Sequence, residues 1–355
     1  FMKDYSKEIE ELVVAVTKEG ASDLHLTVGR HPSIRVSGAL IPIIKKPILT
    51  PEDTLGIAME ILNDENKQIL LEQREVDFSY SPAANVRFRG NAFFQRGMVG
   101  VALRLIPMKV PTIKELNLPE QLADFVHKKQ GFFLVVGPVG QGKSTTLASL
   151  VEMVNHERAE HIITIEDPVE YLFTSDRSII DQREVRFDTK NFYTALRSMF
   201  RQDVNVAMVG EMRTPETISM AVTAAETGHL ILSTLHTNSA AQTIDRIIDS
   251  FPGNQQHQIR MQLAGSLLGV FSQRLIPRIS GGLIPAFELL INNDAVANLI
   301  REGRTAEIDV VIETGSSEGM LDLNRSLAEL VRNGEISADN AFRHSLNPEA
   351  LNRLI

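Results

Sequence analysis

Two patterns of apolar positions alternate in the middle of the chain and predict strands followed by helices. Four short apolar runs have the length of buried strands, and four longer segments repeat apolar residues at helical spacing. The runs are residues 131–136, 161–165, 205–209 and 230–234, and the segments are residues 144–155, 191–201, 215–226 and 239–250. This order predicts an α/β fold whose parallel sheet is covered by helices and binds ligands at the carboxyl ends of its strands.

The first hundred residues show a different pattern. An amphipathic helix is predicted at residues 6–19, and a second helix begins at Thr50-Pro51 and runs to about Leu62. Short strands are predicted between them at residues 23–27, 33–36 and 40–44. Three alternating segments then predict an antiparallel meander. They are residues 76–80, 86–94 and 99–106. Together these elements predict a compact α+β unit of about 100 residues.

A linker is predicted between the two parts, because residues 107–119 contain three prolines and no sustained periodicity. The predicted organisation therefore has four parts. They are an N-terminal α+β domain at residues 1–107, a linker at residues 108–118, an α/β core at residues 119–292 and a helical C-terminal region at residues 293–355.

Composition narrows the class of protein. The 355 residues are 43% hydrophobic and 23% charged, which is typical of a globular protein. A formal net charge of −9 argues against a surface that wraps nucleic acid. Zero cysteines exclude disulfides and zinc-thiolate sites and fit a reducing cytosol. No apolar stretch approaches the roughly 18 residues of a membrane span, and no secretory signal is expected at the N-terminus.

The sequence GPVGQGKS at residues 137–144 matches the phosphate-binding loop G-x-x-x-x-G-K-[ST] at every fixed position. Its glycines let successive backbone N–H groups turn toward a phosphate, and the following helix points its positive end at the same place. Lys143 adds a positive charge, and the Ser144 hydroxyl is the type that ligates Mg²⁺ in such loops. The alternative is a glycine turn without a ligand. The residues expected to bind ATP are Gly137, Pro138, Val139, Gly140, Gln141, Gly142, Lys143, Ser144 and Thr145.

Carboxylates follow two other predicted strands of the core. Glu211 comes directly after a buried strand and Gly210, where a carboxylate orients or deprotonates the attacking water in phosphate-binding-loop enzymes. Glu166 and Asp167 follow another strand, and we expect them to hold Mg²⁺ with Ser144, partly through water, with Glu166 also catalytic. The alternative for Glu211 is an ordinary surface glutamate at the end of a strand.

Two histidines flank the predicted strand at residues 230–234. His229 precedes it and His236 follows it. Zinc is not expected, because the chain has no cysteine and no third ligand at metal spacing. Either histidine can contact the phosphate side of the site or a neighbouring subunit, and a structural role is the alternative for both.

These motifs, in this order, resemble those of the secretion and type IV pilus ATPases. Four segments are similar to the Walker A, Asp-box, Walker B and His-box motifs of that family. They are residues 137–144, 165–170, 209–213 and 223–237. The segments ASDLHL at residues 21–26 and NLIRE at residues 298–302 are also typical, so the resemblance covers nearly the whole chain. It is to the branch that retracts pili in twitching motility, although residues 295–297 depart from the start of the retraction motif.

The resemblance implies a PAS-like N-terminal domain, a RecA-like core and a ring of six copies. In this family ATP and Mg²⁺ bind where the core of one subunit meets the N-terminal domain of the next. By resemblance, Arg89, Arg104 and Arg96 reach the phosphates of a neighbour; the alternative is that they are solvated residues of strand faces. A cytoplasmic motor is implied, which works at the inner face of the bacterial inner membrane on a PilC-like platform protein and is not inserted in the membrane.

Other functions remain as alternatives to the retraction motor. The resemblance also allows an accessory PilU-like paralogue or the ATPase of pilus assembly or type II secretion. A nucleic-acid translocase is disfavoured by the acidic balance, the absence of tryptophan and only 4 tyrosines, which leave few aromatic residues for stacking on bases. A nucleotide-gated regulator without turnover is the third class.

Overall fold

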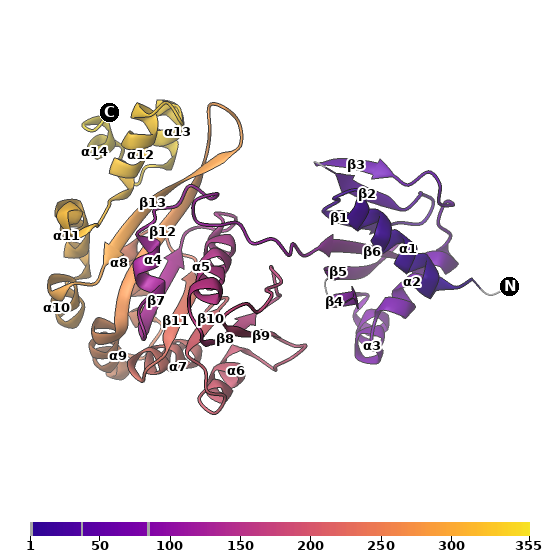
Figure 1. Cartoon of the computed structure of the whole chain (residues 1–355), viewed down its shortest axis with the longest axis horizontal. Helices are drawn as coiled ribbons and strands as arrows, with labels where there is room; N and C mark the ends of the chain where they lie inside the picture. The colour runs from indigo at the N-terminus through magenta and orange to yellow at the C-terminus, as the bar shows by residue number, and fades with distance from the viewer. Residues whose placement is uncertain (1–2, 37, 84–85) are drawn as a thin grey trace. The chain divides into compact units, whose positions relative to one another are not determined.

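The computed structural model describes residues 3–36, 38–83 and 86–355 (Figure 1). The chain divides into two compact units. The first contains the residues up to Lys109 together with Glu170–Leu172, and the second contains Val110–Val169 and Phe173–Ile355. Among the described residues, no helix has both the length and the apolar character that crossing a membrane requires.

The first unit is a six-stranded sheet with three helices. The strand order is β3-β2-β1-β6-β5-β4, with every neighbouring pair antiparallel. The strands are β1 (Asp23–Leu26), β2 (Ser33–Val36), β3 (Ala39–Pro42), β4 (Glu75–Ala83), β5 (Val86–Gln95) and β6 (Met98–Leu105), and the helices are α1 (Tyr5–Lys18), α2 (Pro51–Ile61) and α3 (Asp64–Gln73). Helix α2 packs on β6, and α1 packs on α2.

The local sequence explains the helices of the first unit. Helix α1 buries Ile9, Leu12, Val13 and Val16, a spacing that places all four side chains on one face. Helix α2 begins with a capping box, in which the hydroxyl of Thr50 accepts from the Asp53 N–H and the Asp53 carboxylate accepts from the Thr50 N–H.

The second unit is built on a seven-stranded sheet. Its strand order is β13-β12-β7-β11-β10-β8-β9, parallel throughout except for the antiparallel pair β12 and β13. The strands are β7 (Gly131–Val136), β8 (His161–Glu166), β9 (Ile179–Glu184), β10 (Val206–Val209), β11 (Leu230–Leu235), β12 (Leu267–Pro277) and β13 (Leu283–Ile291). The interior strand β7 is buried at all six positions, as expected for a strand covered on both faces.

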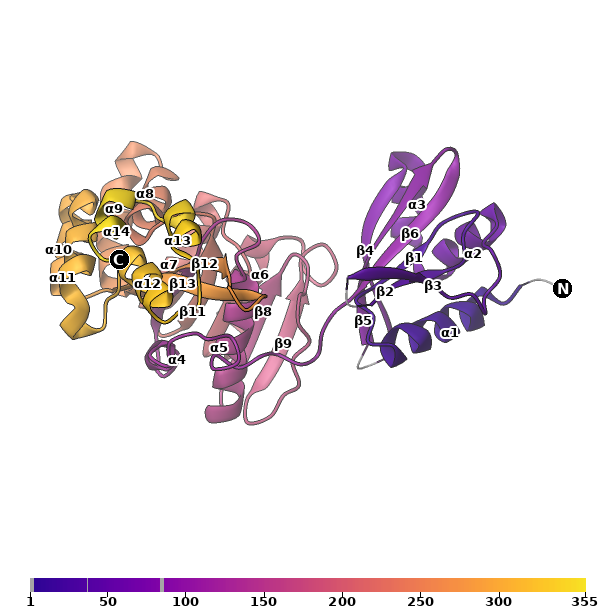
Figure 2. The same ribbon diagram turned by 90° about the horizontal axis from the view of Figure 1, so that it is seen from above.

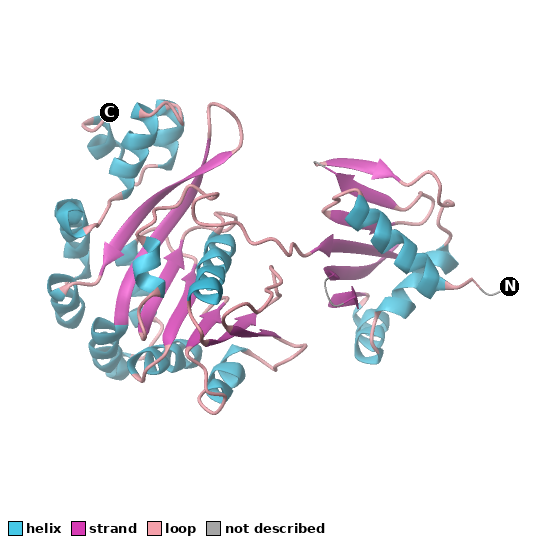
Figure 3. Ribbon diagram, viewed as in Figure 1, coloured by secondary structure: helices cyan, strands magenta, loops and turns pink. Residues whose placement is uncertain are grey.

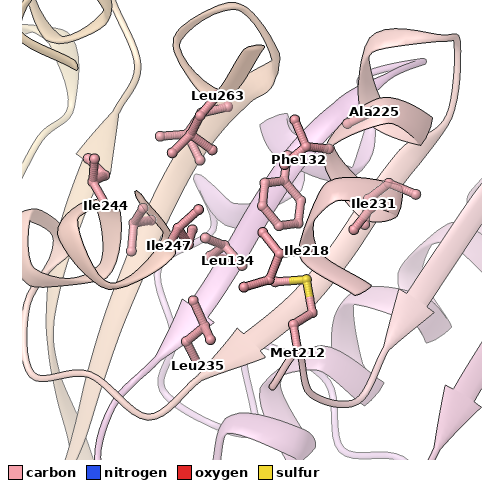
Figure 4. Packing of buried hydrophobic residues seen from close by; sticks show 14 of the residues in the cluster. Phe132, Leu134, Met212, Ile218, Ala225, Ile231, Leu235, Ile244, Ile247 and Leu263 are labelled. Atoms are coloured by element: carbon pink, nitrogen blue, oxygen red, sulfur yellow. The ribbon is translucent and has the colours of Figure 1, made fainter. Parts of the chain in front are cut away.

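Helices cover both faces of this sheet, and successive residues of β7 show it. Phe132, Leu134 and Val136 pack with α6 to α10, whereas Phe133 and Val135 pack with α4 and α5 on the other face. Figure 4 shows Phe132 and Leu134 among side chains of the first group, and in Figure 2 α4 and α5 lie below the strands while α8 and α9 lie above them. The helices are α4 (Leu122–Val126), α5 (Lys143–Glu157), α6 (Phe192–Met199), α7 (Pro215–Glu226), α8 (Ala240–Asp249), α9 (Gly253–Ser266) and α10 (Asp294–Glu302).

The chain beyond β13 is helical (Figure 3). Ile276, Ile284 and Ala286 of the β12–β13 hairpin form a separate core with the last three helices. The elements that follow α10 are η1 (Thr305–Glu307), α11 (Ile308–Thr314), η2 (Gly315–Glu318), α12 (Leu323–Arg332), α13 (Ala338–His344) and α14 (Pro348–Asn352). The hairpin therefore connects the central sheet to the C-terminal helices.

The strands and helices predicted from periodicity all form, with ends shifted by a few residues, but six further elements are present among the described residues. They are α3, α4, β9, α9, β12 and β13. Strand β12 escaped prediction because Ser272, Gln273 and Arg274 interrupt its apolar run. The predicted linker also contributes to packing, because Ile113 and Leu118 are buried with α4 and α5.

Candidate active site

The loop at residues 137–144 connects the carboxyl end of β7 to the first residue of α5. Its glycines have positive φ angles of 147° at Gly137, 77° at Gly140 and 77° at Gly142. A Cβ atom on Gly137 would lie 2.4 Å from the carbonyl oxygen of Gln273. The fold of the loop therefore requires glycine at these positions.

Helix α5 begins inside this loop, with Gly142 as its N-cap and no side-chain hydrogen bond to the cap. The first backbone N–H groups of a helix have no partner within the helix, and they favour an anion together with the positive end of the helix dipole. The loop and the helix start thus form a cradle that suits a phosphate group.

Lys143 lies buried within the cradle. Its Nζ atom donates to the carbonyl oxygens of Gly137 at 2.9 Å and Pro138 at 2.8 Å, and lies 3.2 Å from Nδ1 of His236. The positive charge is therefore held at the centre of the loop by the backbone. This position suits contact with the outer phosphates of a nucleotide.

His236 and Glu211 extend the site from Lys143 toward the end of β10. The Nε2 atom of His236 is 4.0 Å from a carboxylate oxygen of Glu211, whose other oxygen pairs with Arg213 at 2.8 Å. Burial lowers the pKa of His236, and the charge of Lys143 lowers it further. The imidazole is therefore neutral at pH 7, and its Nδ1 atom can accept a hydrogen bond from Nζ of Lys143.

Glu166 and Asp167 lie at the same edge of the sheet as Glu211, because β8 and β10 are neighbouring parallel strands. Glu166 is buried and accepts hydrogen bonds from the Thr164 hydroxyl at 2.7 Å and the Gln182 amide at 3.3 Å. Asp167 is exposed and lines a cavity of about 530 Å³ together with Glu211. Three of the predicted carboxylates are thus brought to one edge.

The donors at this edge fit a magnesium ion bound with a nucleotide. Ser144 is the second residue of α5 and is half-buried beside the cradle. Within the described ranges, no three His, Asp or Glu side chains gather into a metal-binding cluster. With a nucleotide bound, phosphate oxygens and water would supply most of the ligands of a Mg²⁺ ion. Ser144 would ligate the ion directly, and Glu166 and Asp167 would hold its waters.

His229 does not join this site within the chain. It precedes β11 whereas His236 follows it, so the two imidazoles lie at opposite edges of the sheet, roughly 20 Å apart by strand length. His229 Nδ1 is 3.1 Å from the carbonyl oxygen of Ala224, and its ring meets Phe200 edge-on with centroids 5.2 Å apart. A role toward a neighbouring subunit stays a prediction.

The three predicted arginines belong to the first unit. Arg89 and Arg104 face each other across β5 and β6, so their side chains lie on one face of that sheet. Arg104 also donates to the buried carboxylate of Asp23 at 2.9 Å. Arg96 lies in the turn at the other end of the β5–β6 hairpin, about 20 Å along the strand from the pair. Arg89 and Arg104 can thus act on one ligand, and Arg96 lies apart from them.

Sequence reasoning missed Gln273, which contacts the phosphate-binding loop from β12. It is buried and bonds to both Thr146 and Gln141. The available signal was the run of three polar residues, Ser272 to Arg274, in an otherwise apolar segment.

Comparison with known proteins identifies the family. Residues 3–283 match the family described as type II/IV secretion system protein. The chain belongs to this family. It is 44% identical over 342 residues to the type IV pilus retraction ATPase PilT of Pseudomonas aeruginosa, which covers 96% of this chain and 99% of PilT. It is 38% identical to the type IV pilus ATPase PilU of the same organism, over 98% of this chain and 91% of PilU.

A solved structure agrees with the fold. The crystal structure of the pilus retraction motor PilT with bound ADP matches with a TM-score of 0.90 and 45% sequence identity, and it covers 97% of this chain and 99% of that chain. The predicted fold class, an α/β protein with a parallel sheet as its core, is thereby confirmed.

Proposed function

We propose that this chain is an ATPase that powers the retraction of a type IV pilus. The observation that carries the proposal is the 44% identity to a pilus retraction ATPase over almost the full length of both chains. The site supports it, because the phosphate cradle, Lys143, His236 and Glu211 lie side by side at one edge of the sheet. Motor ATPases require such a site to bind and split the terminal phosphate of ATP.

The residues have distinct roles in the proposed reaction. Lys143 and the loop N–H groups bind the β- and γ-phosphates, and Ser144 would hold Mg²⁺, which would supply positive charge beside the phosphates. Glu211 orients the attacking water or takes its proton, and neutral His236 lies between this carboxylate and Lys143. Arg89 and Arg104 stabilise the charge that develops in the transition state of a neighbouring subunit, in a ring of six copies.

We further infer the setting of this motor from its family. The ring works at the inner face of the bacterial inner membrane and acts on a PilC-like platform protein at the base of the pilus. Hydrolysis moves the core relative to the N-terminal unit, and this displacement is passed to the platform.

Glu211→Gln tests the enzymatic part of the proposal. The glutamine keeps the size of the side chain but cannot accept a proton, so Mg²⁺-dependent phosphate release should fall at least about a hundredfold. The dissociation constant for ATP, measured by fluorescence with a labelled nucleotide, should change little because the phosphate cradle is intact. Near-normal phosphate release from the variant would remove Glu211 from the reaction.

Gene deletion tests the direction of movement. In the bacterium that encodes this chain, deletion should leave surface pili in excess and abolish twitching, and the wild-type gene but not Glu211→Gln should restore motility. Cells without pili would instead indicate an assembly ATPase. The 38% identity to PilU over 98% of the chain supports an accessory motor as a second candidate, which predicts that twitching is weakened but not lost.

A further inference from the structure

Gln273 makes two hydrogen bonds that connect β12 to the phosphate-binding loop. Its Oε1 atom accepts from the Thr146 hydroxyl at 2.7 Å, and its Nε2 atom donates to the carbonyl oxygen of Gln141 at 2.7 Å. The side chain is 3% exposed. The orientation of the amide follows from chemistry, because the carbonyl of Gln141 can only accept, so the nitrogen must face it.

The same strand fixes the loop at further points. The backbone N–H of Leu275 donates to Oε1 of Gln141 at 2.7 Å. Gly137 and Gly142 of the loop lie directly against Gln273, since an added Cβ would be 2.4 Å from its carbonyl oxygen at Gly137 and 3.0 Å from its Nε2 atom at Gly142. The loop is therefore fitted closely to this part of β12.

The neighbours of Gln273 hold the other half of the site. Successive residues of a strand face opposite sides, so Ser272 and Arg274 point away from the loop side. Both donate to the carbonyl oxygen of Asn238, at 3.1 Å and 3.3 Å. Asn238 lies two residues after His236, so a single short segment of β12 contacts both the phosphate cradle and the histidine side of the site.

We propose that Gln273 is a positioning residue for nucleotide binding, which holds the phosphate-binding loop and the first turns of α5 in the geometry that accepts the phosphates. The inference rests on the proposed ATPase function. It predicts an effect on nucleotide affinity, because a loop that must be ordered by the ligand binds it more weakly than one held ready. The chemical step should change less, since Gln273 lies behind the loop and contacts no reacting group.

Gln273→Met and Thr146→Val test the proposal. Methionine fills the same space without hydrogen bonds, and valine replaces the threonine hydroxyl with a methyl group. Each substitution should raise the dissociation constant for Mg²⁺-ADP and the KM for ATP about tenfold, with kcat changed less than about threefold. Thr146→Ser, which keeps the hydroxyl, should bind nearly as wild type does. The double variant should be no weaker than the weaker single variant, because both changes break the same connection.

Gln262→Met is the matched control. Gln262 also donates from its side-chain amide, to Glu226 at 2.7 Å, but it lies on α9 away from the loop. It should leave nucleotide affinity unchanged. Additive effects of Thr146→Val and Gln273→Met, or unchanged affinity in both folded variants, would overturn the positioning role. If Gln273→Met does not fold, the contrast between Thr146→Val and Thr146→Ser decides alone.

Failure of this proposal is distinguishable from failure of the proposed function. If wild type binds no nucleotide, the ATPase assignment falls. If wild type binds and hydrolyses ATP while the Gln273 and Thr146 variants do so with equal KM, only the positioning role falls.

Discussion

At the scale of single residues, the two histidines around β11 have similar sequence settings and different positions. His236 lies 3.2 Å from Lys143 at the phosphate edge, whereas His229 lies at the opposite edge beside Ala224 and Phe200. The difference follows from the length and direction of one strand. His236 can therefore act on a nucleotide bound by its own chain, whereas His229 cannot.

The two His→Gln variants turn this difference into a prediction. His236→Gln should slow phosphate release roughly 10- to 100-fold, because the imidazole that lies between Lys143 and Glu211 is lost. His229→Gln should leave the affinity of the chain for Mg²⁺-ADP unchanged, as measured by fluorescence with a labelled nucleotide. A change in phosphate release by His229→Gln that appears only at protein concentrations where rings form would support a role at the interface. Weakened ADP binding by His229→Gln at low concentration would contradict the placement.

At the scale of elements, Glu288 connects β13 to the start of α8. Its buried carboxylate accepts a hydrogen bond from the backbone N–H of Ala240 at 2.7 Å. Burial raises the pKa of Glu288 to about 7, against the favourable effect of that hydrogen bond; Asp309 and Asp322 raise it further and Arg274 lowers it. At a pH between 4.5 and about 7, the carboxyl group is therefore protonated in the folded protein and loses this proton when the protein unfolds.

This shift predicts a pH dependence of stability. The pKa of Glu288 is raised from 4.5 to about 7 in the folded protein. The stability associated with its protonated carboxyl group is therefore fully present below pH 4.5 and is lost as pH rises through about 7. The difference corresponds to about 3 kcal/mol. Glu288→Gln removes the titration while its amide oxygen still accepts from Ala240, so the variant should gain stability relative to wild type between pH 5 and pH 8.

Urea unfolding of both proteins at several pH values measures this gain. Glu329→Gln, an exposed position on α12, is the control and should show a constant difference from wild type. The raised pKa of Asp309, caused by burial and by Glu313, is common to all three proteins and cancels in the comparison. Parallel pH profiles for wild type and Glu288→Gln would show that Glu288 is ionised throughout the range.

At the scale of the whole molecule, the core and the phosphate-binding loop could be predicted from the sequence because both depend on local patterns. The six apolar or small residues of β7 and the helical spacing of α7 can be recognised from these segments alone, without reference to other parts of the chain. Fixed glycine positions identify the loop in the same way. The carboxylates of Glu166 and Glu211 could also be placed at one edge, since parallel strands end together.

The long-range part of the site could not be predicted in this way. Gln273 is 127 residues from Thr146, and nothing in the local pattern of β12 indicates the face that it presents to the loop. Its polar neighbours, Ser272 and Arg274, also interrupt the apolar run from which a strand would be predicted. Arg104 illustrates the same limit, because its contact with Asp23 spans 81 residues and depends on the pairing of β1 with β6. Tertiary pairing fixes these contacts, and periodicity does not record it.

The proposed ring makes a prediction about mixtures of inactive subunits. If each site combines the core of one subunit with Arg89 and Arg104 of the next, Lys143→Ala inactivates the site on its own core, and Arg89→Ala with Arg104→Gln inactivates a neighbour's site. Rings assembled from equal amounts of the two variants should then contain about a quarter of intact sites. Phosphate release should recover to a substantial fraction of wild type, although each variant alone is inactive.

A second mixture supplies the control. Lys143 and Glu211 belong to the same core, so mixing Lys143→Ala with Glu211→Gln leaves every site with one defect, and no recovery is expected. Recovery in the first mixture without recovery in the second requires that the arginines act across subunits, since arginines acting within their own chain would give no intact site in either mixture. Absence of recovery in both, with rings of normal size by light scattering, would confine Arg89 and Arg104 to their own chain.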